Sequence, residues 1–239
     1  MKHDVTSVSS STHTGTVRTR NEDRLLVRSD LGLWAVADGA GGHAGGDVAA
    51  DRIVSDLNGI LPDTSRTLEP DRIARVVENT HRALLDQARQ RGVDAMASTI
   101  AIMISDGSNV VCLWAGDSRV YRYRRGILEQ LTEDHSLTQE LVRSGQITAD
   151  EAERHPRRNI ITRAVGAPGD AFALESTRAT AEPGDMYLIC SDGLCKALND
   201  GEIAATLTWA SDLSPADALM AAALAHQASD NVSAVVVAI

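Results

Sequence analysis

Aromatic residues and positive charge are both scarce in this 239-residue chain. Only 3% of the residues are Phe, Trp or Tyr, and the formal net charge is −10. Binding to nucleic acid or to an anionic membrane requires basic side chains, and single strands also need aromatic side chains on which bases stack. The composition therefore argues against both of these partners, and it suits a protein that binds cations.

Cysteine is also scarce, and the complete set is Cys112, Cys190 and Cys195. An odd, low number argues against a disulfide framework and for a reducing compartment. Cys190 and Cys195 lack the partners and the spacing of a zinc site. We interpret both as packing residues, with modulation by oxidation as the alternative.

We expect neither a targeting segment nor a membrane span. The first ten residues, MKHDVTSVSS, contain no apolar core of a signal peptide. No apolar run approaches the roughly 20 residues that a membrane span needs. Because there is no internal repeat or low-complexity block either, we expect one cytoplasmic domain spanning residues 1–239.

Short β-like runs dominate the sequence. Turn residues at Ser29–Gly32 and at Asp106–Gly107 predict two hairpins, and the spacing of apolar residues predicts helices over 47–58 and 70–90. We expect strands at 24–28, 33–37, 98–105, 109–115, 119–123, 127–131, 173–177, 186–190 and 232–239, and further helices at 135–144, 148–155, 200–207 and 215–226. This order is not a strict βαβ alternation. It predicts an α+β fold with two antiparallel sheets and helices outside them.

Acidic residues stand at the ends of several expected strands, often beside glycine. They are Glu22 or Asp23, Asp38, Asp117, Asp192 and Asp230. Carboxylates that converge at one sheet edge repel each other unless cations neutralise them, and a site with only oxygen ligands favours Mg²⁺ or Mn²⁺. The alternative is that each aspartate only caps a turn, since Asp-Gly is a common turn dipeptide. The pattern alone leaves both interpretations open.

Five sequence blocks extend this pattern. They are Arg18-Thr19-Arg20-Asn21-Glu22-Asp23, Ala37-Asp38-Gly39-Ala40-Gly41-Gly42-His43, Ala115-Gly116-Asp117-Ser118-Arg119, Cys190-Ser191-Asp192-Gly193-Leu194 and Ser229-Asp230-Asn231-Val232-Ser233. In order and spacing they resemble the PPM family of metal-dependent protein phosphatases, also called protein phosphatase 2C, in its compact bacterial branch. The resemblance extends from about Gly15 to the C-terminus. It implies a sandwich of two antiparallel β-sheets flanked by helices, with a two-metal centre at one end.

The resemblance also implies a set of metal ligands. Asp38 would bridge two Mn²⁺ or Mg²⁺ ions, and the backbone carbonyl of Gly39 would join one of them. Asp192 and Asp230 would bind the other ion. Glu22 would bind directly or through water.

Further roles follow from the same resemblance. Asp117, together with Asp192, matches the position of a third, weaker metal in bacterial relatives. Arg18 matches the arginine that holds the substrate phosphate, and its planar fork can bind two phosphate oxygens. Asn231 would orient a metal-bound water. Water that bridges two divalent cations becomes hydroxide near neutral pH and can attack phosphorus, and no cysteine lies in the Cys-x₅-Arg loop that a cysteine nucleophile requires.

The sequence departs from the family at the general acid. Many eukaryotic relatives have Asp-Gly-His-Gly-Gly, whereas Ala40 stands at the histidine position here. His43 is a candidate substitute. Alternatively, His43 only packs against or caps the following helix, and a metal-bound water protonates the leaving oxygen.

Residues 142–166 correspond to the flap, the variable segment beside the active site in this family. Its basic residues are Arg143, Arg154, His155, Arg157, Arg158 and Arg163. They either contact a phosphorylated or acidic protein substrate or form a solvated loop. We expect a monomeric phosphatase acting on phosphoserine and phosphothreonine in proteins, opposite a separate serine/threonine kinase. A catalytically silent scaffold and a hydrolase of small phosphoesters are the alternatives.

Overall fold

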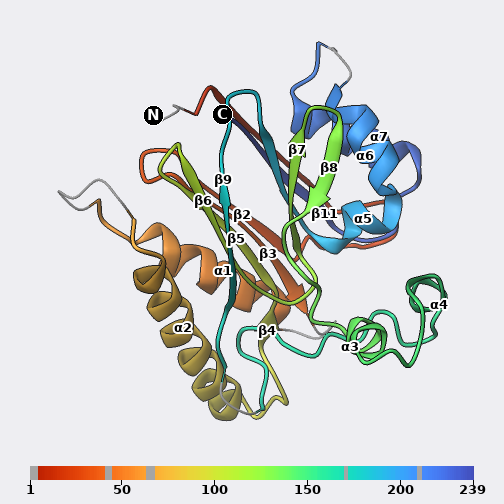
Figure 1. Cartoon of the computed structure of the whole chain (residues 1–239). Coiled ribbons are helices and arrows are strands. Elements are labelled where there is room, and N and C mark those ends of the chain that lie inside the picture. The colour runs from red at the N-terminus through yellow and green to blue at the C-terminus, as the bar shows by residue number, and fades with distance from the viewer. Residues whose placement is uncertain (1–4, 41–44, 63–67, 170–171, 209–211) are drawn as a thin grey trace.

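Two antiparallel β-sheets packed face to face, with helices outside them, form the core of the computed structural model (Figure 1). The structure describes residues 5–40, 45–62, 68–169, 172–208 and 212–239. The predicted α+β class, with two antiparallel sheets flanked by helices, is confirmed.

The first sheet brings the two ends of the chain together. Its strands, in spatial order, are β1 (Ser7–His13), β11 (Val232–Ala238), β10 (Met186–Cys190), β7 (Arg119–Arg124) and β8 (Ile127–Gln130). Strand β1 was not predicted, because its sequence SVSSSTH has no apolar alternation. It forms at the sheet edge, where pairing with β11 from Ser7↔Ala238 to His13↔Val232 supplies its backbone partners.

The second sheet contains both predicted hairpins. Its strands are β2 (Asp23–Arg28), β3 (Leu33–Ala40), β5 (Ile100–Ser105), β6 (Asn109–Ala115) and β9 (Glu175–Thr180), and β4 (Ala97–Ser98) pairs with β3. Two predicted boundaries are wrong. The strand expected at 98–105 is interrupted at Thr99, and the strand expected at 173–177 lies at β9, where pairing with β6 fixes its register.

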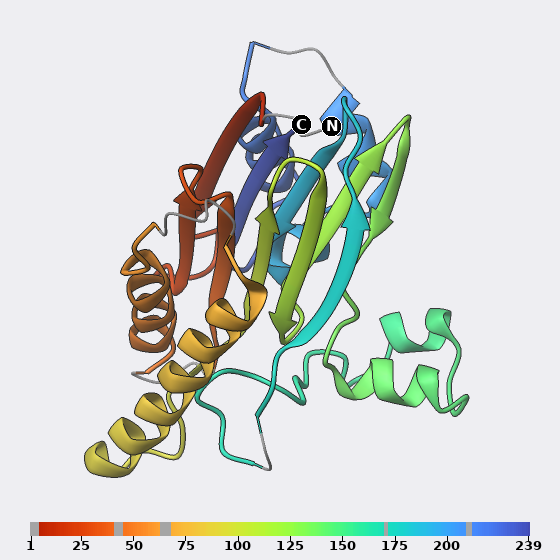
Figure 2. The same cartoon turned by 60° about the vertical axis from the view of Figure 1, so that its left-hand side comes forward.

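Apolar side chains fill the space between the sheets and both outer faces. Trp34, Met103, Tyr187 and Val235 belong to the central cluster between the sheets. Helices α1 (Gly46–Asn58) and α2 (Pro70–Arg91) cover the outer face of the second sheet, and α5 (Asp192–Ala197), α6 (Asp200–Thr208) and α7 (Pro215–Ala225) cover the first (Figures 1 and 2). Because both faces of the sheets are covered, interior strands such as β5 (IAIMIS) and β10 (MYLIC) are almost entirely apolar.

Two short helices lie apart from the sandwich, in and next to the predicted flap (Figure 2). Helix α3 (Leu137–Arg143) starts two residues later than predicted, because the hydroxyl of Ser136 accepts a hydrogen bond from the Gln139 amide and caps it. Helix α4 (Ala149–Glu153) begins with a capping box formed by Thr148 and Glu151. Among the helices described, none has the length and apolar character needed to cross a membrane.

Candidate active site

Carboxylates from distant parts of the chain meet at one end of the sandwich. Asp38 lies near the end of β3 and pairs in register with Asp23 at the start of β2. Asp117 lies between β6 and β7, Asp192 begins α5, and Asp230 precedes β11. Burial raises the pKa of Asp38 well above its ordinary value, and the charges of Asp23, Asp192, Asp117 and Asp230 raise it further. The carboxylates that the sequence singled out therefore share one electrostatic environment.

The break between β4 and β5 positions two of these carboxylates. The Thr99 hydroxyl lies 3.3 Å from the Asp38 amide, which donates to it, and the Thr99 amide donates to the Asp38 carbonyl over 2.8 Å. The same hydroxyl lies 2.7 Å from the hydroxyl of Ser118, the neighbour of Asp117. Thr99 therefore connects the backbones that carry Asp38 and Asp117.

Several carboxylate oxygens in this cluster are buried without a donor. Asp23 and Asp117 are 2% and 8% exposed. Within the described residues, Oδ1 of Asp23, of Asp117 and of Asp192 has no hydrogen-bond partner. Burial raises the pKa of Asp23 to about 6 and that of Asp117 to about 8. Buried oxygens without donors need a compensating partner, and a hard divalent cation fits this donor set.

Two basic side chains already contact the cluster. Arg18 Nε donates to Asp230 Oδ1 over 2.9 Å, and Lys196 Nζ lies 2.5 Å from Asp192 Oδ2 and 3.1 Å from Asp230 Oδ2. Although burial acts to raise the pKa of Asp230, Lys196 and Arg18 bring it below the ordinary value. In the part of the chain that the structure describes, no three acidic, His or Cys side chains already enclose an ion position.

Asn231 connects the N-terminal loop to the start of β11. Its side-chain oxygen accepts from the Glu22 amide over 2.8 Å, and its side-chain nitrogen donates to the carbonyls of Thr14 and Arg20 over 2.8 and 2.9 Å. Both ends of the side chain are thus bonded to backbone. Through these contacts Asn231 holds the loop that carries Arg18 and Glu22. The sequence did not predict this role of Asn231.

Glycine allows the closest backbone approaches around the cluster. A Cβ at Gly193, directly after Asp192, would lie 1.9 Å from the carbonyl oxygen of Asn231. A Cβ at Gly39 would lie 2.5 Å from the backbone of Gly46, where α1 begins. Both positions therefore require glycine. His43, the candidate general acid, lies outside the described residues.

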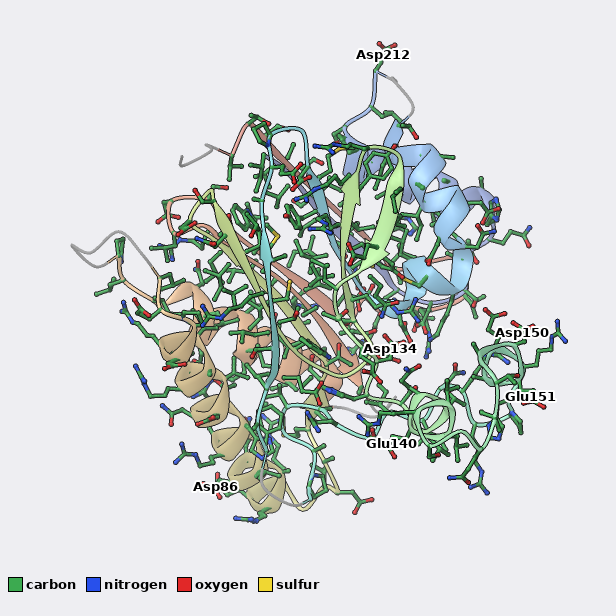
Figure 3. The ribbon with its side chains drawn as sticks, in the orientation of Figure 1. Asp86, Asp134, Glu140, Asp150, Glu151 and Asp212 are labelled. Carbon is green, nitrogen blue, oxygen red and sulfur yellow. The ribbon has the colours of Figure 1, made fainter. Side chains whose placement is uncertain are left out.

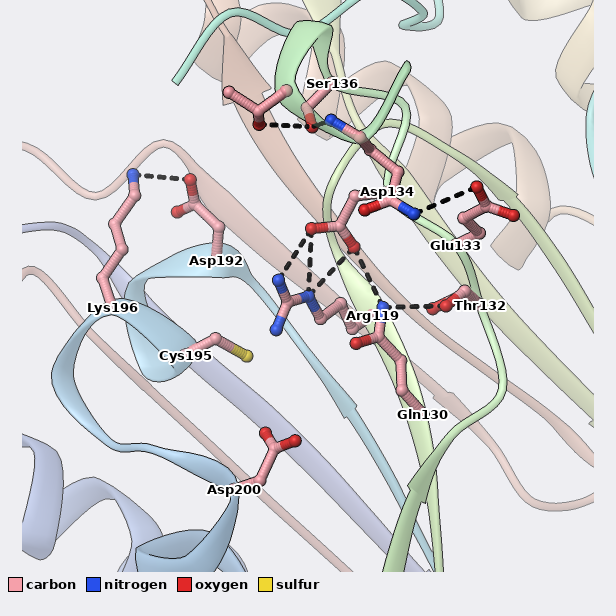
Figure 4. A network of polar contacts seen from close by, with 12 residues as sticks. Arg119, Gln130, Thr132, Glu133, Asp134, Ser136, Asp192, Cys195, Lys196 and Asp200 are labelled. Carbon is pink, nitrogen blue, oxygen red and sulfur yellow. Dashed lines mark hydrogen bonds and ion pairs between the residues drawn. The ribbon is translucent and has the colours of Figure 1, made fainter. Parts of the chain in front are cut away.

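A groove of about 910 Å³ runs from the carboxylates to the flap, between α3 and α4 on one side and α5 and α6 on the other. Asp117, Asp192 and Lys196 line it together with Arg158 of the flap. Figure 4 shows the wall formed by Arg119, whose guanidinium binds both carboxylate oxygens of Asp134. The Arg119–Asp134 pair and Lys196 were missed in the sequence, although Lys196 stands four residues after Asp192, the spacing of one helical turn.

The predicted basic residues of the flap do not share one surface. Arg158 lines the groove beside the carboxylates. Arg143 and Arg163 line a separate, smaller pocket, where Arg163 lies 3.1 Å from Glu175. Only part of the predicted basic cluster therefore faces the site.

Buried aspartates with single oxygens that lack a donor in the described structure lie at one end of a two-sheet sandwich, so the site defines a class of protein suited to binding hard divalent cations. The family profile described as protein phosphatase 2C matches residues 12–232. The serine/threonine phosphatase stp of Listeria monocytogenes serotype 4b is 33% identical over 235 residues, which cover 95% of this chain and 93% of the relative.

Solved structures of other proteins are also similar to this chain. The structure of PppA, described as a key regulatory component of T6SS in Pseudomonas aeruginosa, has a TM-score of 0.85 and 37% identity, covering 97% of this chain and 96% of its own. The catalytic domain of PstP in complex with two manganese ions has a TM-score of 0.84 and 30% identity, covering 97% of each chain. The chain belongs to the protein phosphatase 2C family and is a metal-dependent serine/threonine protein phosphatase. The family uses Mn²⁺ or Mg²⁺ at a two-metal site.

Proposed function

We propose that the buried carboxylate cluster holds two Mn²⁺ or Mg²⁺ ions and is the site of phosphoester hydrolysis. Asp38 would hold both ions, and the carbonyl of Gly39 would contribute to one of them. Asp192 and Asp230 would hold the other, with Glu22 contributing directly or through water. The observation that supports this assignment is the set of buried aspartate oxygens without hydrogen-bond donors, among them Oδ1 of Asp192.

The side chains around the ions bind and orient the substrate. When bound, the two cations activate a water and neutralise charge on the phosphoryl oxygens. The Arg18 side chain is 55% exposed, and its ion pair among the described residues is made by Nε with Asp230, so its two terminal nitrogens can take two oxygens of a phosphate. Asn231 keeps Arg18 within reach, because it holds the loop from Thr14 to Glu22.

Two further assignments extend the proposal. Asp117, with Asp192, binds a third and weaker ion, since both line the groove and each has one oxygen without a donor in the described structure. Protonation of the leaving oxygen comes from His43 or from water held at the site. Ala40, at the usual position of the acid in many eukaryotic relatives, has no side chain that could donate a proton.

We also propose that residues 1–239 form one catalytic domain with the flap at about 142–166, which acts as a monomer in the cytoplasm on proteins phosphorylated by a separate serine/threonine kinase. The central apolar cluster supports a single domain, because it includes residues from Val5 to Ile239. The groove between the flap and α5 supports a protein substrate, since its volume of about 910 Å³ is much larger than a phosphate group requires.

Neutralising one flap residue should separate protein substrates from small ones. We expect Arg158→Gln to lower kcat/KM for a phosphothreonine protein about 3- to 10-fold, as the loss of one charged contact does, and to leave p-nitrophenyl phosphate unaffected. Arg158 lines the groove, whereas the neighbouring Arg157 is exposed and lines none of the pockets described. Arg157→Gln is therefore the matched control. Equal losses on both substrates would contradict a role in protein recognition.

Substrate profiling tests the proposed function. We expect phosphothreonine and phosphoserine peptides to be hydrolysed with higher kcat/KM than sugar phosphates or nucleotides, because only a peptide fills the groove beside the flap. Faster hydrolysis of small phosphoesters would favour the alternative of a small-molecule phosphatase. A folded protein that binds Mn²⁺ but cleaves none of these compounds would instead be a scaffold.

A further inference from the structure

Lysine is almost absent from this chain. The sequence contains 21 arginines but only two lysines, Lys2 and Lys196. Lys2 lies outside the described residues, so Lys196 is the single lysine in the described part of the chain. Every other long cationic side chain there is an arginine, and lysine therefore marks one place in the fold.

That place is the carboxylate cluster. Lys196 lies one helical turn after Asp192 on α5, and its Nζ lies 2.5 Å from Oδ2 of Asp192 (Figure 4). The same Nζ lies 3.1 Å from Oδ2 of Asp230. Asp192 and Asp230 come from different elements, so this one ammonium group connects two carboxylates that would otherwise repel each other. The Lys196 side chain is 40% exposed and also lines the groove.

A divalent ion and this ammonium group need the same oxygens. An ion bound by Asp192 and Asp230 would occupy the oxygen lone pairs to which Lys196 Nζ now donates, and two cations at such short range repel each other. Lysine is suited to such an exchange, because it is a compact point charge on a flexible stem, whereas the planar fork of arginine favours a fixed bidentate pair. Asp200 and Glu202 line the same groove and offer carboxylates to the displaced ammonium.

We propose that Lys196 is a tethered cation that exchanges with the divalent ion at Asp192 and Asp230. It neutralises the two carboxylates when no ion is bound, and it lowers the affinity of the site for Mn²⁺ and Mg²⁺. This inference rests on the proposed role of Asp192 and Asp230 as metal ligands. It makes Lys196 a residue that sets metal affinity.

The scarcity of lysine gives a direct test. Protein labelled with ¹³C at lysine Cε should give two side-chain signals by NMR, one from Lys196 and one from Lys2, which serves as the internal control. We expect saturating Mg²⁺ to shift the Lys196 signal and to leave the Lys2 signal in place. A Lys196 signal that does not move, while calorimetry shows that Mg²⁺ binds, would overturn the inference alone. Absence of Mg²⁺ and Mn²⁺ binding would instead overturn the metal site as well.

Metal affinity tests the same inference by substitution. We expect Lys196→Gln to lower the Kd for Mn²⁺ about tenfold, the equivalent of about 1.4 kcal/mol, and Lys196→Arg to change it less. The unfolding temperature of the EDTA-treated Lys196→Gln protein should fall by about 2–4 °C, because the two carboxylates lose their shared cation.

Arg52→Gln is the matched control. On α1, Arg52 Nε lies 2.8 Å from Oδ2 of Asp56, four residues later, so this substitution also removes an ion pair between residues one helical turn apart. It should leave the Kd for Mn²⁺ unchanged. Equal Mn²⁺ affinity in wild type and Lys196→Gln would overturn the inference. If Lys196→Gln does not fold, the NMR titration of the wild-type protein decides.

Discussion

Asp38→Asn should abolish phosphatase activity and at the same time stabilise the protein in EDTA. Asparagine keeps the shape of the side chain but removes the charge that bridges two cations in the proposed site. Loss of this ligand should lower kcat by about 10³-fold or more, the equivalent of about 4 kcal/mol in transition-state stabilisation. In EDTA, however, the same change removes repulsion, since burial and the nearby aspartates hold the pKa of Asp38 well above its ordinary value.

A substitution that lowers activity but raises stability identifies a functional carboxylate, whereas loss of a structural carboxylate would lower both. Steady-state hydrolysis of p-nitrophenyl phosphate with Mn²⁺ and thermal unfolding in EDTA measure the two effects. The matched control is Asp86→Asn on α2, where the side chain is 64% exposed and lies far from the site (Figure 3). An Asp38→Asn protein that keeps its activity, or that is less stable than wild type in EDTA, would contradict the proposed role of Asp38.

Chelation should make the stability of the folded protein depend strongly on pH. Asp117, with a pKa raised by burial to about 8, and Asp38 hold protons more tightly in the folded than in the unfolded state. The free energy of unfolding in EDTA should therefore fall as pH rises from 6.5 to 8, by roughly 2–4 kcal/mol. The buried His81 and His135, whose pKa values burial lowers, have their effect below this range.

Urea unfolding at pH 6.5, 7.2 and 8.0, with EDTA and with saturating Mn²⁺, measures this dependence. Bound Mn²⁺ replaces the protons as the neutralising charge, so the protein should be more stable at pH 8 and its stability should vary less with pH. Asp117→Asn should also flatten the dependence in EDTA. Stability that rises with pH in EDTA would contradict the raised pKa values and, with them, the electrostatic account of the cluster.

Local sequence patterns predicted the elements that are formed by turn residues close in sequence or by regularly spaced apolar residues. The hairpin of β2 and β3 and the two long helices α1 and α2 follow from turn residues and apolar spacing. Strand β1 and helix α5 did not follow, for different reasons. The polar strand β1 depends on its pairing with β11 from the other end of the sequence, which begins with Ser7 opposite Ala238. Helix α5 is six residues long and contains a glycine, so its helical pattern is too short to detect.

The carboxylates of the site could be found in the sequence because each stands beside an apolar strand or a glycine. Their partners could not, because partners come from tertiary contacts. The pairing of Arg119 with Asp134 depends on how the chain returns after β8, and the bonds of Asn231 depend on the loop after β1. Lys196 reaches Asp230 only because α5 begins beside the start of β11. The sequence was therefore sufficient to identify the carboxylates of the site, whereas their contacts with other residues could be identified only from the folded structure.

Whether the buried carboxylates hold the catalytic ions can be tested most directly by one assay. Hydrolysis of a phosphothreonine peptide should be measured with Mn²⁺ and with EDTA, for wild type and for Asp192→Ala. We expect wild type to be active with Mn²⁺ and inactive with EDTA, and Asp192→Ala to lose about 10²-fold or more with Mn²⁺. Activity that persists in EDTA, or an Asp192→Ala protein as active as wild type, would contradict the claim.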